Sequence, residues 1–167
     1  FCGVAAETGA GAPAEWLGQR VTSIVYFTTC GVCRFCSTGQ WNLCPQRKSV
    51  GSGVHGAFAR YVLVPARNLR RLPANVDFVA GAVTEPLACC THGVLEKAVV
   101  RPGDVVLVTG PGAIGLLTAQ IALAQGARVV LAGTPDDQAR LELAQQLGVQ
   151  HTTTRTPLEL VQDLTNG

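Results

Sequence analysis

The stretch "VVLVTGPGAIGLLTAQIA", residues 105–122, decides the fold of the second half of the chain. A short apolar run, residues 105–109, leads into a glycine-rich turn and then into an apolar segment of helical length, residues 116–125. A second short apolar run follows at residues 129–132. Strand, turn, helix and strand at this spacing predict a parallel sheet with right-handed crossovers.

The turn in this stretch carries the pattern Gly-x-Gly-x-x-Gly, formed by Gly110, Gly112 and Gly115 with Ala113 and Ile114 between the last two. After a strand and before a helix, this pattern is typical of a dinucleotide-binding turn. The first glycine permits a tight turn, the second lets the backbone approach a pyrophosphate, and the third lets the helix pack on the strand. The helix N-terminus adds free N–H groups for the phosphates. The alternative is a plain flexible turn, and the complete strand–helix–strand frame argues against it.

The sequence leaves the choice between NAD and NADP open. An acidic residue at the end of the second strand, about 20 residues after the turn, would select NAD by binding the ribose 2′-hydroxyl. Gly133 and Thr134 hold that place, and Asp136 and Asp137 come slightly too late. Small neutral residues there remove repulsion against a 2′-phosphate, and Arg140 is near enough in sequence to pair with one. The two aspartates equally fit the start of a helix capped by Thr134.

Two helices in the last third begin with the same signal, a threonine followed by proline and then by an acidic residue. They begin at Thr134 and Thr156. The first is expected to end at Gly148, and Asn166 with Gly167 would cap the second.

The first half of the chain has a different sequence pattern, in which short apolar runs are separated by glycine-rich turns. Residues 21–27 and 58–64 predict strands, so this half is expected to be all-β or barrel-like. A helix is expected at residues 87–98, and Pro86 biases Glu85 away from the helical conformation.

Four cysteines lie in "CGVCRFCSTGQWNLCP", residues 30–45, at Cys30, Cys33, Cys36 and Cys44. A disulfide framework is disfavoured because the strand–helix pattern is that of an intracellular enzyme. A bacterial ferredoxin run also ends in Cys-Pro, but only three residues precede its last cysteine, against seven here. A closed four-thiolate zinc site fits best, and such a site is structural because no position stays open for substrate. An iron–sulfur site and metal-free thiols are the alternatives.

The composition sets outer limits on function. Hydrophobic residues make up 47% of the chain and charged residues 14%, which allows a sizeable core and excludes a disordered chain. The net charge of +2, from 13 basic and 11 acidic residues, is too balanced to indicate a nucleic-acid partner. No apolar run reaches the length that spans a membrane. The chain begins with Phe1 and contains no methionine, so we expect it to be a piece of a longer protein.

A cysteine lobe ahead of a Gly-x-Gly-x-x-Gly unit resembles the zinc-dependent medium-chain dehydrogenases. The stretch "TEPLACCTHG", residues 84–93, and residues 105–122 look most like the polyol branch of sorbitol, galactitol and threonine dehydrogenases. The resemblance implies an α/β chain made of a partial GroES-like domain, residues 1–98, with its zinc lobe at residues 30–44. The first part of a doubly wound Rossmann domain would follow at residues 99–167.

The activity implied is oxidation of a secondary alcohol or polyol by hydride transfer to NAD or NADP. The partners implied are a small-molecule substrate, no nucleic acid and no membrane, and the complete protein would be a cytoplasmic homo-oligomer.

The family's chemistry uses a second, catalytic zinc ion that lowers the pKa of the bound alcohol. By resemblance, Glu85 is the remnant of that site, and the other ligands, a cysteine and a Gly-His-Glu motif, would lie before Phe1. We therefore expect Zn²⁺ at the four cysteines, a catalytic Zn²⁺ only in a complete parent, and no dehydrogenase activity from the isolated chain. The alternative is a module that binds zinc and nucleotide but performs no chemistry.

Overall fold

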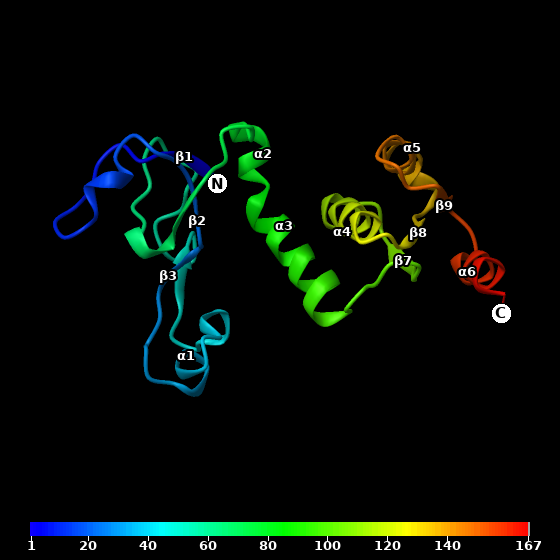
Figure 1. Ribbon diagram of the computed structural model, residues 1–167, viewed down its shortest axis with the longest axis horizontal. Helices are drawn as coiled ribbons and strands as arrows, with labels where there is room; N and C mark the ends of the chain where they lie inside the picture. Colours follow the sequence, from blue (N-terminus) through cyan, green and yellow to red (C-terminus); the bar gives the residue numbers. More distant parts are fainter. Residues whose placement is uncertain (167) are drawn as a thin grey trace. The chain divides into compact units, whose positions relative to one another are not determined.

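The computed structural model describes residues 1–166, which form two compact units (Figure 1). The first unit is Phe1–Glu85 and the second begins at Pro86. The division falls inside helix α3 (Thr84–Thr91), and the domain boundary expected between residues 98 and 99 stays a prediction.

The first unit is built on two small sheets, as its short apolar runs predict. One sheet is antiparallel, with its strands in the order β1 (Cys2–Val4), β2 (Arg20–Ser23) and β6 (Leu69–Arg71). The other contains β3 (Tyr26–Thr28), β4 (Lys48–Val50) and β5 (Gly53–Val54). Short helices complete the unit: η1 (Ala14–Trp16), α1 (Arg34–Ser37), η2 (Trp41–Leu43), η3 (Ala66–Asn68) and α2 (Phe78–Ala82).

The single strand expected at residues 21–27 is in fact two strands in different sheets. Between β2 and β3 the chain is held by Asn68, which is buried and donates from its side-chain nitrogen to the carbonyl oxygens of Ile24 (3.3 Å) and Tyr26 (2.5 Å). One buried amide thereby bonds carbonyl groups on both sides of Val25, where the chain passes from β2 to β3.

The prediction of a strand at residues 58–64 is wrong. This segment has no regular structure in the described part of the chain, and the side chains of Phe58 and Leu63 are largely exposed. Aromatic and β-branched residues favour a strand only where a neighbouring strand supplies hydrogen bonds and a packing face. No described strand pairs with this segment in a sheet.

Five arginines of the first unit lie over aromatic rings. The guanidinium groups of Arg20, Arg34, Arg47, Arg60 and Arg71 each lie over a ring, at 4.5 to 5.5 Å from its centre.

The second unit contains the predicted parallel sheet. Its strands lie in the order β7 (Val105–Thr109), β8 (Arg128–Ala132) and β9 (His151–Thr153). Helices α4 (Ala113–Ala124) and α6 (Pro157–Thr165) pack against β7 and β8, and α5 (Gln138–Gln146) packs against β8 and β9 (Figure 1). A short η5 (Pro135–Asp137) precedes α5. The α/β fold class is confirmed, although β9 was not recognised in the sequence.

The core of the second unit explains why the apolar runs fall where they do. Val129, Val130 and Leu131 of β8 are almost completely buried, since β8 is the central strand and both of its faces are covered. Ala119 and Ala122 of α4 are fully buried against this sheet. Small residues at these two positions let the helix lie close to the strands.

The expectation that Glu85 lies outside a helix is wrong. Glu85 and Pro86 are both in the first turn of α3. Proline is tolerated there because backbone N–H groups of a first helical turn have no intrahelical acceptor. The helix continues as a π-helix, η4 (His92–Lys97), and Val99 then adopts a φ of +53°. In the described residues, no helix has both the length and the apolar character needed to cross a bilayer.

Candidate functional site

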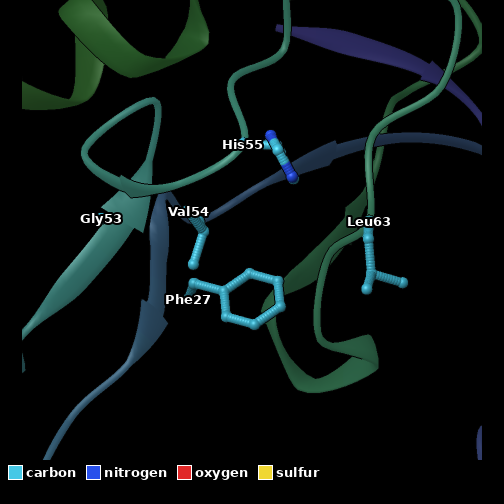
Figure 2. Close-up of a pocket in the computed structure, with 5 residues that line it drawn as sticks. All are labelled: Phe27, Gly53, Val54, His55 and Leu63. Atoms are coloured by element: carbon cyan, nitrogen blue, oxygen red, sulfur yellow. The ribbon is translucent and has the colours of Figure 1, made fainter.

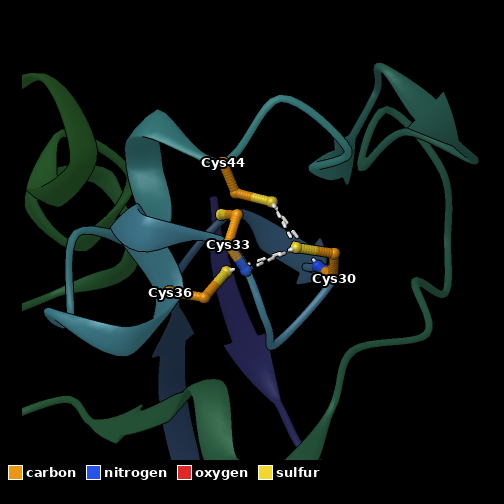
Figure 3. Close-up of side chains that lie close together, drawn as sticks. All are labelled: Cys30, Cys33, Cys36 and Cys44. Atoms are coloured by element: carbon orange, nitrogen blue, oxygen red, sulfur yellow. Dashed lines mark hydrogen bonds between the residues drawn. The ribbon is translucent and has the colours of Figure 1, made fainter.

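The four predicted cysteines come together in the first unit (Figure 3). Cys30 follows β3, Cys33 is the N-cap of α1, Cys36 lies within α1, and Cys44 follows η2. Their sulfur atoms all lie within 4.8 Å of one another, and Cys36 and Cys44 are buried. The short helix and the 3-10 turn therefore serve to aim four thiols at one point.

The sulfur spacing fits a single tetrahedral metal ion. The Sγ atom of Cys30 lies 3.9 Å from that of Cys36 and 3.7 Å from that of Cys44. Four thiolates at a Zn–S distance of about 2.3 Å stand about 3.8 Å apart at the corners of a tetrahedron. Disulfide sulfurs would be about 2.05 Å apart, and no disulfide joins these four cysteines. Spacing this tight leaves room for one ion rather than for a cluster of several iron atoms.

The environment prepares one of the four thiols for metal binding. Backbone hydrogen bonds from Val32 and Cys33 lower the pKa of Cys30 to about 6, whereas burial raises the pKa of Cys36 to about 11. The backbone N–H of Cys33 lies 3.4 Å from the sulfur of Cys30. Because only thiolates bind zinc, Cys30 would offer a formed thiolate to the ion and Cys36 would have to lose its proton.

The glycine turn of the second unit has the geometry that its sequence demands. Gly110 has a φ of +89°, in the left-handed region that glycine adopts without steric cost. Gly112 is the N-cap of α4, and the space beside its α-carbon is open to 4 Å. A Cβ on Gly115 would lie 1.9 Å from the carbonyl oxygen of Gly110, so helix and turn touch at this point.

The residues after β8 form a closed hydrogen-bonded turn. Asp137 accepts hydrogen bonds on Oδ2 from the backbone N–H of Thr134 (3.0 Å) and from its hydroxyl (2.8 Å). Arg140 forms an ion pair with Oδ1 of the same carboxylate at 3.0 Å. The bonds from Thr134, and then Arg140, lower the pKa of Asp137. The interpretation of this segment as a capped helix start is confirmed, and the side chain of Arg140 stays 64% exposed.

Glu85 is exposed in the first turn of α3. Among residues 1–166, the only group of three or more His, Cys, Asp and Glu side chains close enough to share a metal is the four-cysteine cluster. The structure therefore does not bring Glu85 together with further metal ligands in the described chain.

Two features were not found by sequence reasoning. The thiol of Cys90, buried in α3, donates to the carbonyl oxygen of Ile114 at 3.6 Å and so joins α3 to the first turn of α4. In the first unit, an open groove of about 550 Å³ is lined by Phe27, Gly53, Val54, His55 and Leu63 (Figure 2). Sequence spacing gives no signal for either, because both depend on segments that the fold brings together.

The comparisons with known proteins agree with this geometry. Residues 1–74 match the family described as the alcohol dehydrogenase GroES-like domain. The sorbitol dehydrogenase of Halalkalibacterium halodurans is 42% identical over 170 aligned residues, covering all of this chain and 49% of the relative. Over its whole length the chain is similar to polyol dehydrogenases. It spans about half the length of the curated relatives that it matches.

Solved structures place this chain among proteins of the same fold. A zinc-binding dehydrogenase of Sinorhizobium meliloti, bound to NADP, superposes with a TM-score of 0.86 at 36% identity, over 97% of this chain and 46% of that one. An alcohol dehydrogenase of E. coli in complex with NADH superposes with a TM-score of 0.86 at 29% identity, over 100% of this chain and 50% of that one. The two units are thus a GroES-like part and a Rossmann part.

Proposed function

We propose that this chain is part of a zinc-dependent oxidoreductase. The enzyme would oxidise a secondary alcohol or polyol by hydride transfer to NAD or NADP. One observation carries the proposal: the match to a sorbitol dehydrogenase extends over the whole chain, which contains both the thiol cluster and the glycine turn. The match to a D-arabitol-phosphate dehydrogenase of Enterococcus avium, also over the whole chain, supports a polyhydroxylated substrate.

The role proposed for Cys30, Cys33, Cys36 and Cys44 is structural. Zinc held by four thiolates has no open position, so it stabilises the loop and does not polarise a substrate. The role of the chain is to present four thiolates at tetrahedral spacing, with the lowered pKa of Cys30 favouring the first contact.

Cofactor binding is proposed for the glycine turn and the end of β8. The open space beside Gly112 admits a pyrophosphate, and the N–H groups at the start of α4, beginning with Ala113, Ile114 and Gly115, point toward it. No acidic residue lies in the first turn of α4, so nothing there repels phosphate. Gly133, Thr134 and Arg140 would contact the adenosine ribose or a phosphate on it. In the domain division that we propose, residues 1–98 form the GroES-like part and residues 99–167 the Rossmann part.

For Glu85 we propose the place of a ligand, or of a residue that holds a water ligand, at a catalytic zinc. An open zinc site needs about three protein ligands, and one carboxylate does not hold the ion. We therefore expect this chain by itself to be inactive as a dehydrogenase. The complete protein is proposed to act in the cytoplasm as a homo-oligomer.

Metal analysis and cofactor binding on the purified chain test these proposals. We expect about one zinc ion per chain, lost on replacement of Cys44, and saturable binding of NAD or NADP. An iron content with a visible absorption band would contradict the zinc proposal. An absence of cofactor binding would contradict the oxidoreductase proposal. Reduction of NAD or NADP with sorbitol by the isolated chain would contradict the expectation that the chain is inactive because Glu85 alone does not hold a catalytic zinc ion.

A further inference from the structure

We propose that Cys90 is a positioning residue of the proposed dinucleotide site, and that it acts through the peptide group between Ile114 and Gly115. The inference rests on the proposed cofactor binding and goes beyond it by assigning a role to a residue outside the glycine turn. The buried thiol of Cys90 donates to the carbonyl oxygen of Ile114 at 3.6 Å. This contact ties α3 to the second residue of α4.

Side-chain packing does not anchor the first turn of α4. Gly112 and Gly115 have no side chain. The side chains of Ala113 and Ile114 are exposed, that of Ile114 to 56%. The position of this turn therefore depends largely on contacts made by its backbone. Cys90 supplies one such contact, from a residue with only 5% of its surface exposed.

The carbonyl that accepts from Cys90 belongs to the same peptide group as the N–H of Gly115. A peptide group is planar and almost always trans, so its C=O and its N–H point in opposite directions. A bond that fixes the carbonyl of Ile114 therefore also fixes the direction of the N–H of Gly115. It also polarises the peptide group, which strengthens that N–H as a donor.

The N–H of Gly115 is one of the groups that a bound pyrophosphate would use. Gly115 is the third residue of α4, and an N–H at this position has no acceptor inside a helix. Such groups are available to an anion at the helix N-terminus. Because a hydrogen bond weakens steeply when its donor is misaligned, a turn held in one orientation binds the anion more tightly. Cys90 thus contributes to affinity without touching the cofactor.

The first test compares two ligands that differ in the pyrophosphate. Titration of the purified, zinc-loaded chain measures the dissociation constants of ADP-ribose, which carries the pyrophosphate, and of adenosine, which has no phosphate. We expect Cys90→Ala to weaken the binding of ADP-ribose about fivefold, the ratio that corresponds to one ordinary hydrogen bond. The binding of adenosine should weaken by less than about twofold, because adenosine makes no bond to the turn.

Further variants separate the hydrogen bond from the volume and from the stability of the site. Cys90→Ser keeps a donor and should retain the affinity for ADP-ribose within about twofold. Cys90→Val fills the space without a donor and should bind as weakly as Cys90→Ala. Val149→Ala is the matched control, since Val149 is buried in the core of the same unit. It should lower the thermal midpoint but leave the affinity for ADP-ribose unchanged below that midpoint.

Equal weakening of both ligands by Cys90→Ala would indicate a merely structural role and would overturn the proposal. Unchanged binding of ADP-ribose by Cys90→Val would overturn it too, as would a loss in Cys90→Ser as large as that in Cys90→Ala. In each of these cases the proposed cofactor site survives, because the unsubstituted chain binds. If that chain binds neither ADP-ribose nor NAD nor NADP, the cofactor site itself fails, and the role of Cys90 fails with it.

A ligand-free measurement tests the link through the peptide group. The amide nitrogen chemical shift of Gly115 responds to polarisation of the carbonyl of Ile114. We expect this shift to change in Cys90→Val and to return toward the parent value in Cys90→Ser, while Val149→Ala leaves it unchanged. A Gly115 resonance that is the same in the parent and in Cys90→Val would overturn the assignment, whatever the ligands do.

Discussion

The carbonyl oxygen of Gly110 lies 1.9 Å from the point that a Cβ on Gly115 would occupy. Non-bonded carbon and oxygen atoms do not approach that closely, so a side chain at position 115 must push the first turn of α4 away from β7. This contact brings the helix N-terminus over the end of the strand, where a pyrophosphate would bind.

Gly115→Ala is therefore expected to destabilise the second unit by about 3 kcal/mol or more, the upper range for overpacking in a close-packed site. Gly112→Ala is the matched control, because no atom lies within 4 Å of its Cβ position. It should change the free energy of unfolding little and lower the affinity for NAD or NADP. Chemical denaturation and cofactor titration measure the two effects, and equal stability losses in the two variants would contradict the prediction.

Val99→Gly is expected to stabilise the chain by about 1 kcal/mol. Val99 follows the π-helix at a φ of +53°, and the N–H of Val100 bonds to the carbonyl of Val94, as at a helix end closed by a left-handed residue. A β-branched residue in this conformation costs about 1–2 kcal/mol, which exceeds the backbone entropy cost of glycine. Val99 is half exposed, so little packing is lost.

Val100→Gly provides the control for that substitution. Val100 packs against the core of the second unit, and its replacement should lower the free energy of unfolding. A destabilised Val99→Gly variant in urea denaturation would refute the strain argument.

Cys44→Ser is expected to abolish stoichiometric zinc binding and to unfold residues 30–44, because structural zinc supplies much of the folding free energy of such loops. Cys89→Ser should retain the metal, since Cys89 lies outside the cluster. Zinc content after gel filtration and protease resistance of the lobe are the measurements. Full zinc occupancy in Cys44→Ser would disprove the four-thiolate site.

The turn after β8 should become less stable in acid. Its hydrogen bonds lower the pKa of Asp137 below the ordinary value of 3.8, so the ionised carboxylate stabilises the folded state. This contribution is complete above pH 3.8 and is lost as the pH falls through the lowered native pKa. The difference in thermal midpoint between the parent and Asp137→Asn should therefore shrink below about pH 4. A difference that stays constant from pH 7 to pH 3 would show that the charge is not responsible.

Local patterns predicted the features that depend on local sequence. The apolar runs of β7 and β8, the glycine turn and the cap at Thr134 each lie within a few consecutive residues, and all are present. Cysteine spacing likewise predicted the cluster, because neighbouring residues in a short loop are forced together.

Features that need a distant partner could not be predicted in this way. Strand β9 has no apolar run, and it forms because His151, Thr152 and Thr153 pair with β8. Residues 58–64 have strand-like composition but no described neighbour to pair with. The contact between Cys90 and Ile114 joins residues 24 positions apart, and only the packing of two helices reveals it.

The four thiols of the metal centre come from a single segment, with Cys30 and Cys44 only 14 positions apart. Closing so short a loop costs little chain entropy. A metal ion can therefore collect these ligands before the antiparallel strands have found their partners. We therefore expect the lobe to form before the sheets when zinc is present.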